Sequence, residues 1–350
     1  MRGRTVAAVA AVLLAVGACS ADGAAPGPDG GTRPPRPGPG EGGSVMRGVT
    51  LPSWYRTDYD SPAAARYLRD IRATGAGWVT FTPTWYQKRR GDSVMRPTEE
   101  TASDAGLERI VRRAHAAGLK VMIKPHVDLP GDGDRAEIRP RDRAAWFAAY
   151  RSFITHYADL AADTDAEQFA VGTELAGVSG DGKAWTRVVD AVRDHYDGPL
   201  TYAANYDEYE KIPFWKELDL IGIDTYWPLS DRATEDAGQL RRAWEPISGK
   251  LAAFARRHDR RILFTEAGYV SQRGTTTAPY SWDISSRAGN AEQAAAYRAL
   301  LDTFTGRQWW AGVSWWMWDD WPDSGETPKR LAYTPRGKPA EQVLRDSWSD

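Results

Sequence analysis

Short apolar segments recur along most of the chain, and between them lie longer segments whose apolar residues have helical spacing. Several of the short segments are continuously apolar, which is typical of parallel strands that are buried on both faces. Strands that alternate with helices indicate βαβ units in one parallel sheet. The sequence predicts eight strands, at Met46–Leu51, Gly77–Phe81, Lys120–Pro125, Gln168–Glu174, Leu200–Ala204, Leu218–Asp224, Arg261–Glu266 and Gly312–Met317.

Such a sheet is either open and doubly wound or closed into a barrel. A doubly wound sheet usually has a glycine-rich phosphate loop after its first strand, and the segment Leu51–Tyr55 contains no glycine. Eight units in the region from residue 45 to residue 350 match a (β/α)8 barrel, which usually takes about 250 residues. We therefore predict an α/β fold, a (β/α)8 TIM barrel in a single domain at 45–350.

The first 44 residues have a different composition. Arg2 and Arg4 precede the apolar stretch Val6–Val16, which is too short to span a membrane as a mature helix and is typical of a signal peptide. The stretch leads to Cys19, the single cysteine of the chain, in a setting that resembles a bacterial lipobox. We expect a lipoprotein signal peptide at 1–18 and a Pro/Gly-rich flexible linker at 19–44.

This N-terminus predicts an extracytoplasmic protein that is anchored to the outer face of the cell membrane through lipidated Cys19. The formal net charge is −2 and the basic residues are scattered, so no nucleic-acid partner is indicated. No His/Cys/Asp cluster has the spacing of a catalytic metal site. We expect no metal, no other cofactor and a monomeric protein.

In a barrel, the residues at the carboxyl ends of the strands meet in one pocket. Glu174 ends the fourth predicted strand and Glu266 ends the seventh. A charge at the end of a buried strand costs free energy unless it meets water, a partner or a substrate. Either glutamate alone can be a salt-bridge partner. As a pair on strands that face each other across the mouth, they are the arrangement that two-carboxylate glycoside hydrolysis requires.

Aromatic residues also gather at these strand ends. The chain has 16 Trp and 15 Tyr against 8 Phe, and Trp and Tyr suit stacking on sugar rings as well as core packing. His126 and Asn205 follow strands three and five, where loop packing or a turn is the alternative to substrate binding. The predicted substrate-binding residues are Trp54, Trp85, His126, Asn205, Tyr226, Trp282, Trp316 and Trp318.

Two loops and one lysine complete the predicted mouth. The acidic, glycine-containing segment Asp128–Glu137 misses the twelve-residue calcium pattern, so we expect a mobile rim there. The segment Ser271–Arg287 contains Trp282 and is expected to contact substrate, because βα loops carry specificity in barrels. Lys124 lies on the same face as His126, and the sequence does not single it out.

Four segments resemble glycoside hydrolase clan A, and most closely its family 113, which contains β-mannanases. They are Phe169–Glu174, Ile221–Trp227, Phe264–Tyr269 and Trp315–Trp318, and the similarity extends from Met46 onward. The resemblance implies that Glu174 is the general acid/base, that Glu266 is the nucleophile and that Tyr226 bonds the nucleophile. It also places Trp318, or Trp316, beneath the sugar at the cleaved bond.

Thr173 departs from the pattern of that clan, where Asn often precedes the acid/base. The hydrogen bond to the sugar 2-hydroxyl must then come from elsewhere or be weaker. The resemblance implies a retaining enzyme that cleaves β-1,4-linked mannan-type polysaccharide or oligosaccharide. The alternatives are a retaining enzyme acting on xylan or β-glucan, and a carbohydrate-binding lipoprotein without catalysis.

Overall fold

The computed structural model describes residues 45–131, 133–318 and 329–349. The predicted signal peptide at 1–18, Cys19 and the whole predicted linker at 19–44 therefore lie outside the described residues. Among the helices of the described ranges, none combines the length and the apolar character that a membrane span needs.

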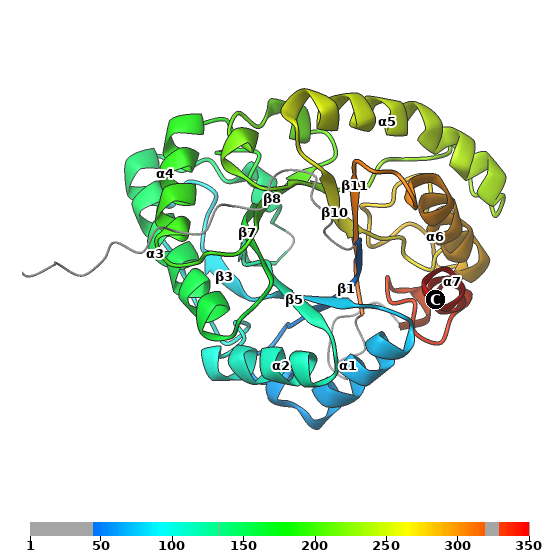
Figure 1. Ribbon diagram of the computed structural model, residues 1–350, viewed down its shortest axis with the longest axis horizontal. Coiled ribbons are helices and arrows are strands. Elements are labelled where there is room, and N and C mark those ends of the chain that lie inside the picture. The colour runs from blue at the N-terminus through cyan, green and yellow to red at the C-terminus, as the bar shows by residue number, and fades with distance from the viewer. Residues whose placement is uncertain (1–44, 132, 319–328, 350) are drawn as a thin grey trace, which may run out of the picture. The chain divides into compact units, whose positions relative to one another are not determined.

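Eight parallel strands close into a barrel (Figure 1). In the order in which they pair around the ring, they are β1 (Met46–Pro52), β11 (Trp310–Trp315), β10 (Ile262–Ala267), β9 (Ile221–Asp224), β8 (Leu200–Asn205), β7 (Gln168–Thr173), β5 (Lys120–Ile123) and β2 (Trp78–Thr82). Each of these strands overlaps one of the eight predicted strand segments. The predicted (β/α)8 barrel is confirmed.

Helices surround the strands as an outer ring (Figure 1). They are α1 (Pro62–Ala73), α2 (Asp104–Ala116), α3 (Arg143–Asp163), α4 (Gly182–Arg193), α5 (Ala237–His258), α6 (Asn290–Phe304) and α7 (Pro339–Trp348). Helices α1 and α2 begin after Ser61 and Ser103, whose hydroxyls accept backbone N–H groups of the first turn. Such N-caps satisfy donors that have no partner within the helix.

A second, small sheet has the order β4–β3–β6, from β3 (Thr84–Gln87), β4 (Met95–Arg96) and β6 (His126–Asp128). Strand β3 follows β2 and β6 follows β5, and the two pair in parallel beyond the carboxyl ends of those barrel strands. Short 3-10 helices lie in the loops: η1 (Asp58–Asp60), η2 (Arg135–Glu137), η3 (Tyr209–Lys211), η4 (Trp215–Glu217) and η5 (Lys329–Leu331). The small sheet therefore fixes where the loop carrying η2 begins.

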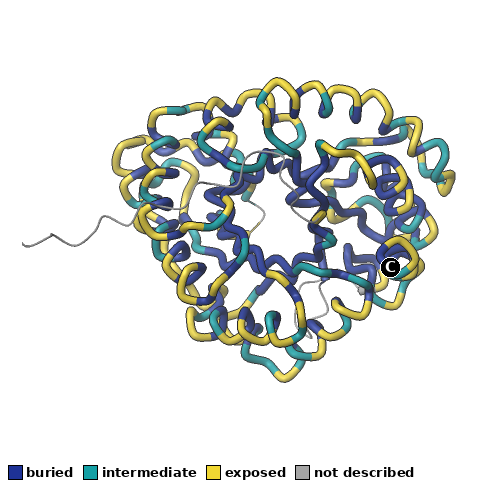
Figure 2. Tube along the Cα trace, in the orientation of Figure 1, coloured by how far each residue is buried: buried dark blue, intermediate teal, exposed yellow. Residues whose placement is uncertain are grey.

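The core lies between the strands and the helices, and the buried inner ring contrasts with the exposed outer faces of the helices (Figure 2). Much of the tryptophan content is packed there, which limits the number of rings available to a ligand. The fully buried tryptophans are Trp146, Trp185, Trp215, Trp244, Trp315 and Trp318. Inside the barrel, the Ser314 hydroxyl shares hydrogen bonds with those of Thr50 (2.9 Å) and Thr80 (2.8 Å).

Candidate active site

Glu174 directly follows β7 and has φ of 54°, in the left-handed region that residues other than glycine rarely adopt. Two hydrogen bonds to β8 hold this turn. The Glu174 N–H donates to the Ala203 carbonyl at 2.8 Å, and the Leu175 N–H donates to the Tyr202 hydroxyl at 2.9 Å. Strained backbone that the surroundings hold in place is a frequent property of functional sites. Here it presents the carboxyl at the end of the strand.

Glu266 lies in β10 and its side chain is almost fully buried. Oε2 accepts a hydrogen bond from the Tyr226 hydroxyl at 2.6 Å, and Oε1 accepts one from the Nζ of Lys124, which is also fully buried. The Glu266 carbonyl accepts bonds from the backbone N–H and the hydroxyl of Thr225, at 2.8 and 2.9 Å. An ammonium and a hydroxyl donor together suit an ionised carboxylate.

Glu174 has a different environment. Its Oε2 lies 3.5 Å from Nη1 of Arg135, and its side chain is 19% exposed. Burial raises the pKa of Glu174 well above its ordinary value, the charges of Asp224 and Glu266 act in the same direction, and Arg135 and Lys124 oppose them. The site therefore favours the protonated form of Glu174, whereas Glu266 lies between two hydrogen-bond donors. Two chemically identical groups therefore lie in different electrostatic environments.

Asp224 at the end of β9 is a third buried carboxyl group in this site. Its Oδ1 accepts a hydrogen bond from the Thr265 hydroxyl at 2.7 Å, and its Oδ2 has no partner among the described residues. Burial, followed by the charge of Glu266, raises the pKa of Asp224 to about 7. Asp224 was not predicted as a site residue, although it ends a buried strand and a charge in that position is the signal that identified Glu174 and Glu266.

His126 and Trp316 form a stacked pair next to Lys124. Their ring centroids lie 6.2 Å apart at an interplanar angle of 21°, and the Lys124 Nζ lies 5.6 Å from the Trp316 ring centroid. Burial lowers the pKa of His126 well below its ordinary value, and Arg135 and Lys124 add to the effect, so the imidazole is neutral. Its buried Nε2 finds no protein partner among the described residues. A neutral imidazole with a free nitrogen suits a hydroxyl group.

Three further predicted contacts lie on the same side of the barrel. Trp54 is partly buried and packs against the cluster that contains Tyr226 and Trp316. Asn205 ends β8 and its backbone N–H donates to Glu208. Trp282, in the loop between β10 and α6, is 42% exposed, and its ring centroid lies 4.8 Å from that of Tyr333.

The structure places two predicted substrate-binding residues elsewhere. Trp318 is fully buried and its backbone N–H donates to the Thr50 carbonyl, so the ring offers no face to a ligand. Trp316, the alternative, keeps a small exposed area and contacts His126. Trp85 lies in β3, where its ring packs against residues of α3. Those residues are Phe153, His156 and Tyr157, with centroid separations of 5.3, 5.8 and 6.3 Å.

Arg135, Asp224 and Tyr333 were not among the residues predicted for the site, and Lys124 was left undecided. Lys124 is the last residue but one of the predicted third strand, so the strand-end signal was present for it too. Tyr333 had no such signal, because it follows η5 far along the chain. The predicted rim at Asp128–Glu137 contains Arg135, which bonds Asp128 and reaches Glu174. This loop therefore supplies a charge to the site.

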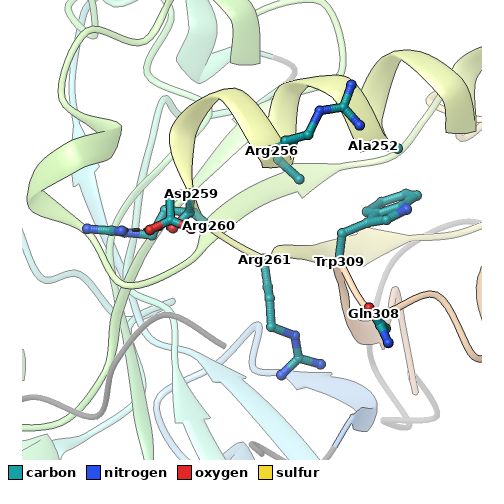
Figure 3. A pocket seen from close by; sticks show the side chains of 8 residues that line it. Ala252, Arg256, Asp259, Arg260, Arg261, Gln308 and Trp309 are labelled. Atoms are coloured by element: carbon teal, nitrogen blue, oxygen red, sulfur yellow. Dashed lines mark hydrogen bonds between the residues drawn. The ribbon is translucent and has the colours of Figure 1, made fainter. Parts of the chain in front are cut away.

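No metal-binding group of three or more His, Cys, Asp or Glu side chains occurs within residues 45–131, 133–318 and 329–349. A hollow of about 310 Å³ lies at the opposite end of the barrel, where Arg261 and Trp309 directly precede β10 and β11. Figure 3 shows the guanidinium groups of Arg256, Arg260 and Arg261 pointing in different directions. These cations do not converge on one ligand position.

Comparisons with known proteins agree with this geometry. Residues 52–338 match the model of Glycoside Hydrolase Family 113. The GH113 beta-mannanase AaManA from Alicyclobacillus acidocaldarius, in complex with ManMIm, is 27% identical with a TM-score of 0.78, over 87% of this chain and 97% of that one. A structure of a GH113 beta-1,4-mannanase is 25% identical with a TM-score of 0.78, over 87% of this chain and 99% of that one.

A complex of a GH113 beta-1,4-mannanase has the same TM-score of 0.78 at 24% identity, over 87% of this chain and 99% of that one, and this likeness speaks for the fold alone. A search among curated proteins found no match. The family match covers most of the chain and includes both strand-end glutamates. The chain therefore belongs to Glycoside Hydrolase Family 113 and is a glycoside hydrolase.

Proposed function

We propose that the protein cleaves β-1,4 bonds within mannan-type polysaccharide or oligosaccharide, with retention of anomeric configuration. The observation that carries the mechanism is the contrast between the two glutamates: Glu266 is held by Tyr226 and Lys124, whereas burial and neighbouring carboxylates favour the protonated form of Glu174. The choice of mannan follows the beta-mannanases to which the chain is similar.

In the first step, a Glu266 oxygen attacks the anomeric carbon and the bond from that carbon to the leaving oxygen breaks. Glu174 gives its proton to the leaving oxygen, so the leaving sugar departs as a neutral alcohol. In the second step, water attacks the anomeric carbon of the glycosyl ester and Glu174 takes the proton of the water. Glu266 leaves as a carboxylate, and the enzyme returns to its starting form.

The electrostatics of the site favour this alternation. The negative charge of Glu266 is one of the causes of the raised pKa of Glu174. Ester formation removes that charge, so the pKa of Glu174 falls at the stage where it must act as a base. Lys124 and Arg135 remain in place throughout and favour the ionised form of Glu174.

Substrate binding is proposed to use the residues around this pair. The Trp316 ring and the neutral His126 lie beside Lys124, where a sugar ring can stack and a hydroxyl can bond to His126 Nε2. Trp54, Asn205 and Trp282 are proposed for outer contacts. The Thr173 hydroxyl has no partner among the described residues but is fully buried, so the contact to the sugar 2-hydroxyl is proposed to come from another residue.

A substrate panel tests the proposed function. We expect reducing sugar to be released from mannan and glucomannan at rates at least tenfold above those from xylan and β-glucan, because specificity between sugar backbones rests on differential hydroxyl contacts. Proton NMR of the first product should show the β-anomer before mutarotation. Faster cleavage of xylan or β-glucan would replace the proposed substrate, and an α-anomer as first product would exclude retention.

Replacing Tyr226 with phenylalanine is expected to lower kcat about 10- to 150-fold. The hydroxyl makes a buried 2.6 Å bond to the attacking carboxylate, and a hydrogen bond to a charged group contributes about 1.5–3 kcal/mol. Steady-state kinetics on mannan measures the loss. Tyr209→Phe is the matched control, since its hydroxyl bonds Glu210 away from the pair. Equal kcat in Tyr226→Phe and the control would contradict a role for this bond.

A further inference from the structure

The guanidinium of Arg135 lies between two carboxylates and is 16% exposed. Its Nε donates to Asp128 Oδ1 at 2.6 Å, and its Nη1 lies 3.5 Å from Glu174 Oε2. The helix η2 that carries it begins directly after Asp134, whose side chain accepts the Ala136 N–H at 2.8 Å. The capped backbone of η2 and the bond to Asp128 therefore hold the guanidinium in place, with its Nη1 directed at Glu174.

Charged and titratable groups face Glu174 from every side of the pocket. Asp224 comes from β9, Glu266 from β10, Lys124 from the end of β5 and Arg135 from η2. Burial raises the pKa of the Tyr333 hydroxyl well above its ordinary value, and the charges of Glu266 and Glu174 add to the effect, so this hydroxyl also faces the pair. Lys124 is hydrogen-bonded to Glu266. Among the described residues, Arg135 is thus the cation in ion-pair contact with Glu174.

We propose, on the basis of the function proposed above, that Arg135 is a positioning residue that sets the balance between the acid form and the base form of Glu174. Burial and two neighbouring carboxylates favour the acid form, which the first step uses. The fixed cation favours the ionised form, which the second step uses. Asp128 orients the guanidinium and offsets part of its charge, so that the cation moderates the proton affinity of Glu174 without abolishing it.

Replacing Arg135 with a neutral residue is expected to change the pKa of Glu174 in one direction. In Arg135→Gln, the pKa of Glu174 rises further, by about one pH unit, because an opposite charge at this range usually lowers a carboxyl pKa by about 1–3 and Asp128 offsets part of the charge. Glu174 then stays protonated to higher pH, and the basic limb of kcat/KM moves upward by about one unit. The pKa of Glu174 in the glycosyl-enzyme rises as well, so at pH values below it less Glu174 is ionised and the second step slows by up to about tenfold.

The experiment measures kcat/KM from pH 4 to pH 9 on a manno-oligosaccharide, whose sugar leaving group needs the acid, and kcat over the same range on a 2,4-dinitrophenyl β-mannobioside. This good leaving group needs no acid, so the second step limits kcat, and a slower second step lowers kcat and KM together. The variants are Arg135→Gln, Arg135→Met, which keeps the apolar stem, and Arg135→Lys, which keeps the charge. Arg90→Gln is the control, because Arg90 pairs with Glu137 of the same helix η2 at the surface, with side chains 60% and 48% exposed.

We expect the limb to move in Arg135→Gln and Arg135→Met, to stay near that of the wild type in Arg135→Lys, and not to move in Arg90→Gln. The proposal would be overturned if the basic limb of kcat/KM were unchanged in all the Arg135 variants, or if they lost the same fraction of kcat/KM at every pH. Arg135 would then have a structural role. If one neutral variant fails to fold, the other gives the same readout. Failure of the proposed function is separate: Glu174→Ala would then lack azide rescue, whatever Arg135 does.

Discussion

Glu266→Gln is expected to lower kcat/KM on mannan by roughly 10⁴-fold or more, because the amide cannot form the glycosyl ester through which both steps pass. Glutamine keeps the shape of the side chain, and its carbonyl oxygen can accept a hydrogen bond from Lys124 or Tyr226. Alanine is a poorer test. It leaves the buried Lys124 without its partner, and breaking a buried ion pair costs about 3–5 kcal/mol of stability.

The measurement combines steady-state kinetics with a thermal unfolding curve that reports the fold. Glu167→Gln is a matched control, since Glu167 directly precedes β7 at the end of the barrel away from Glu174 and bonds His115 and the Val121 N–H. A 2-fluoro mannoside inactivator should label Glu266 in the wild-type chain, as located by mass spectrometry. Activity of Glu266→Gln within tenfold of the wild type, or a label on another residue, would remove Glu266 from the nucleophile role.

Glu174→Ala is expected to lower kcat on mannan by roughly 10²–10⁴-fold, the range typical of a lost general acid/base. The same variant should lose little in the first step on a dinitrophenyl mannoside, because that leaving group departs without a proton. Its second step then has no base, so the glycosyl-enzyme accumulates and KM falls. Azide, a nucleophile that needs no base, should restore turnover and yield the β-glycosyl azide.

The control for this variant is Glu208→Gln, which alters another buried glutamate at the same end of the barrel. Glu208 follows β8 and bonds the Tyr202 hydroxyl and the Asn205 N–H. Azide should not accelerate it. Glu174 would be excluded as the acid/base if azide did not accelerate Glu174→Ala and if this variant were slowed equally on mannan and on the dinitrophenyl mannoside. That result would point to misfolding of the turn after β7.

The barrel was predictable because continuous apolar runs mark strands that are buried on both faces. The ends of the strands were less so. The predicted sixth strand begins at Leu218, but β9 begins at Ile221 because 215–217 form η4. The small sheet was missed because β3, β4 and β6 have only two to four residues each. Segments of that length carry no periodicity that distinguishes them from loops.

The two glutamates were predictable because a charge at the end of a buried strand is unusual in itself. The choice between Trp316 and Trp318 was not, because both follow β11 and only their packing separates them. Trp85 was misplaced because the chain continues from β2 into β3 and carries the ring onto α3. Arg135 lies in the short 3-10 helix η2, and its side chain is held by Asp128 and Glu174. These contacts are not visible in the local sequence around Arg135, so its place in the site was not predictable.

The hydroxyl cluster inside the barrel bears on how the chain is made. Ser314 of β11 joins Thr50 of β1 across 264 positions of sequence, and β11 is one of the two neighbours of β1 in the ring. During synthesis, one edge of β1 therefore has no native partner until almost the whole chain has left the ribosome. Contacts of such long range form slowly, and an unpaired edge invites pairing with other chains. The nascent protein is accordingly expected to depend on chaperones that shield that edge.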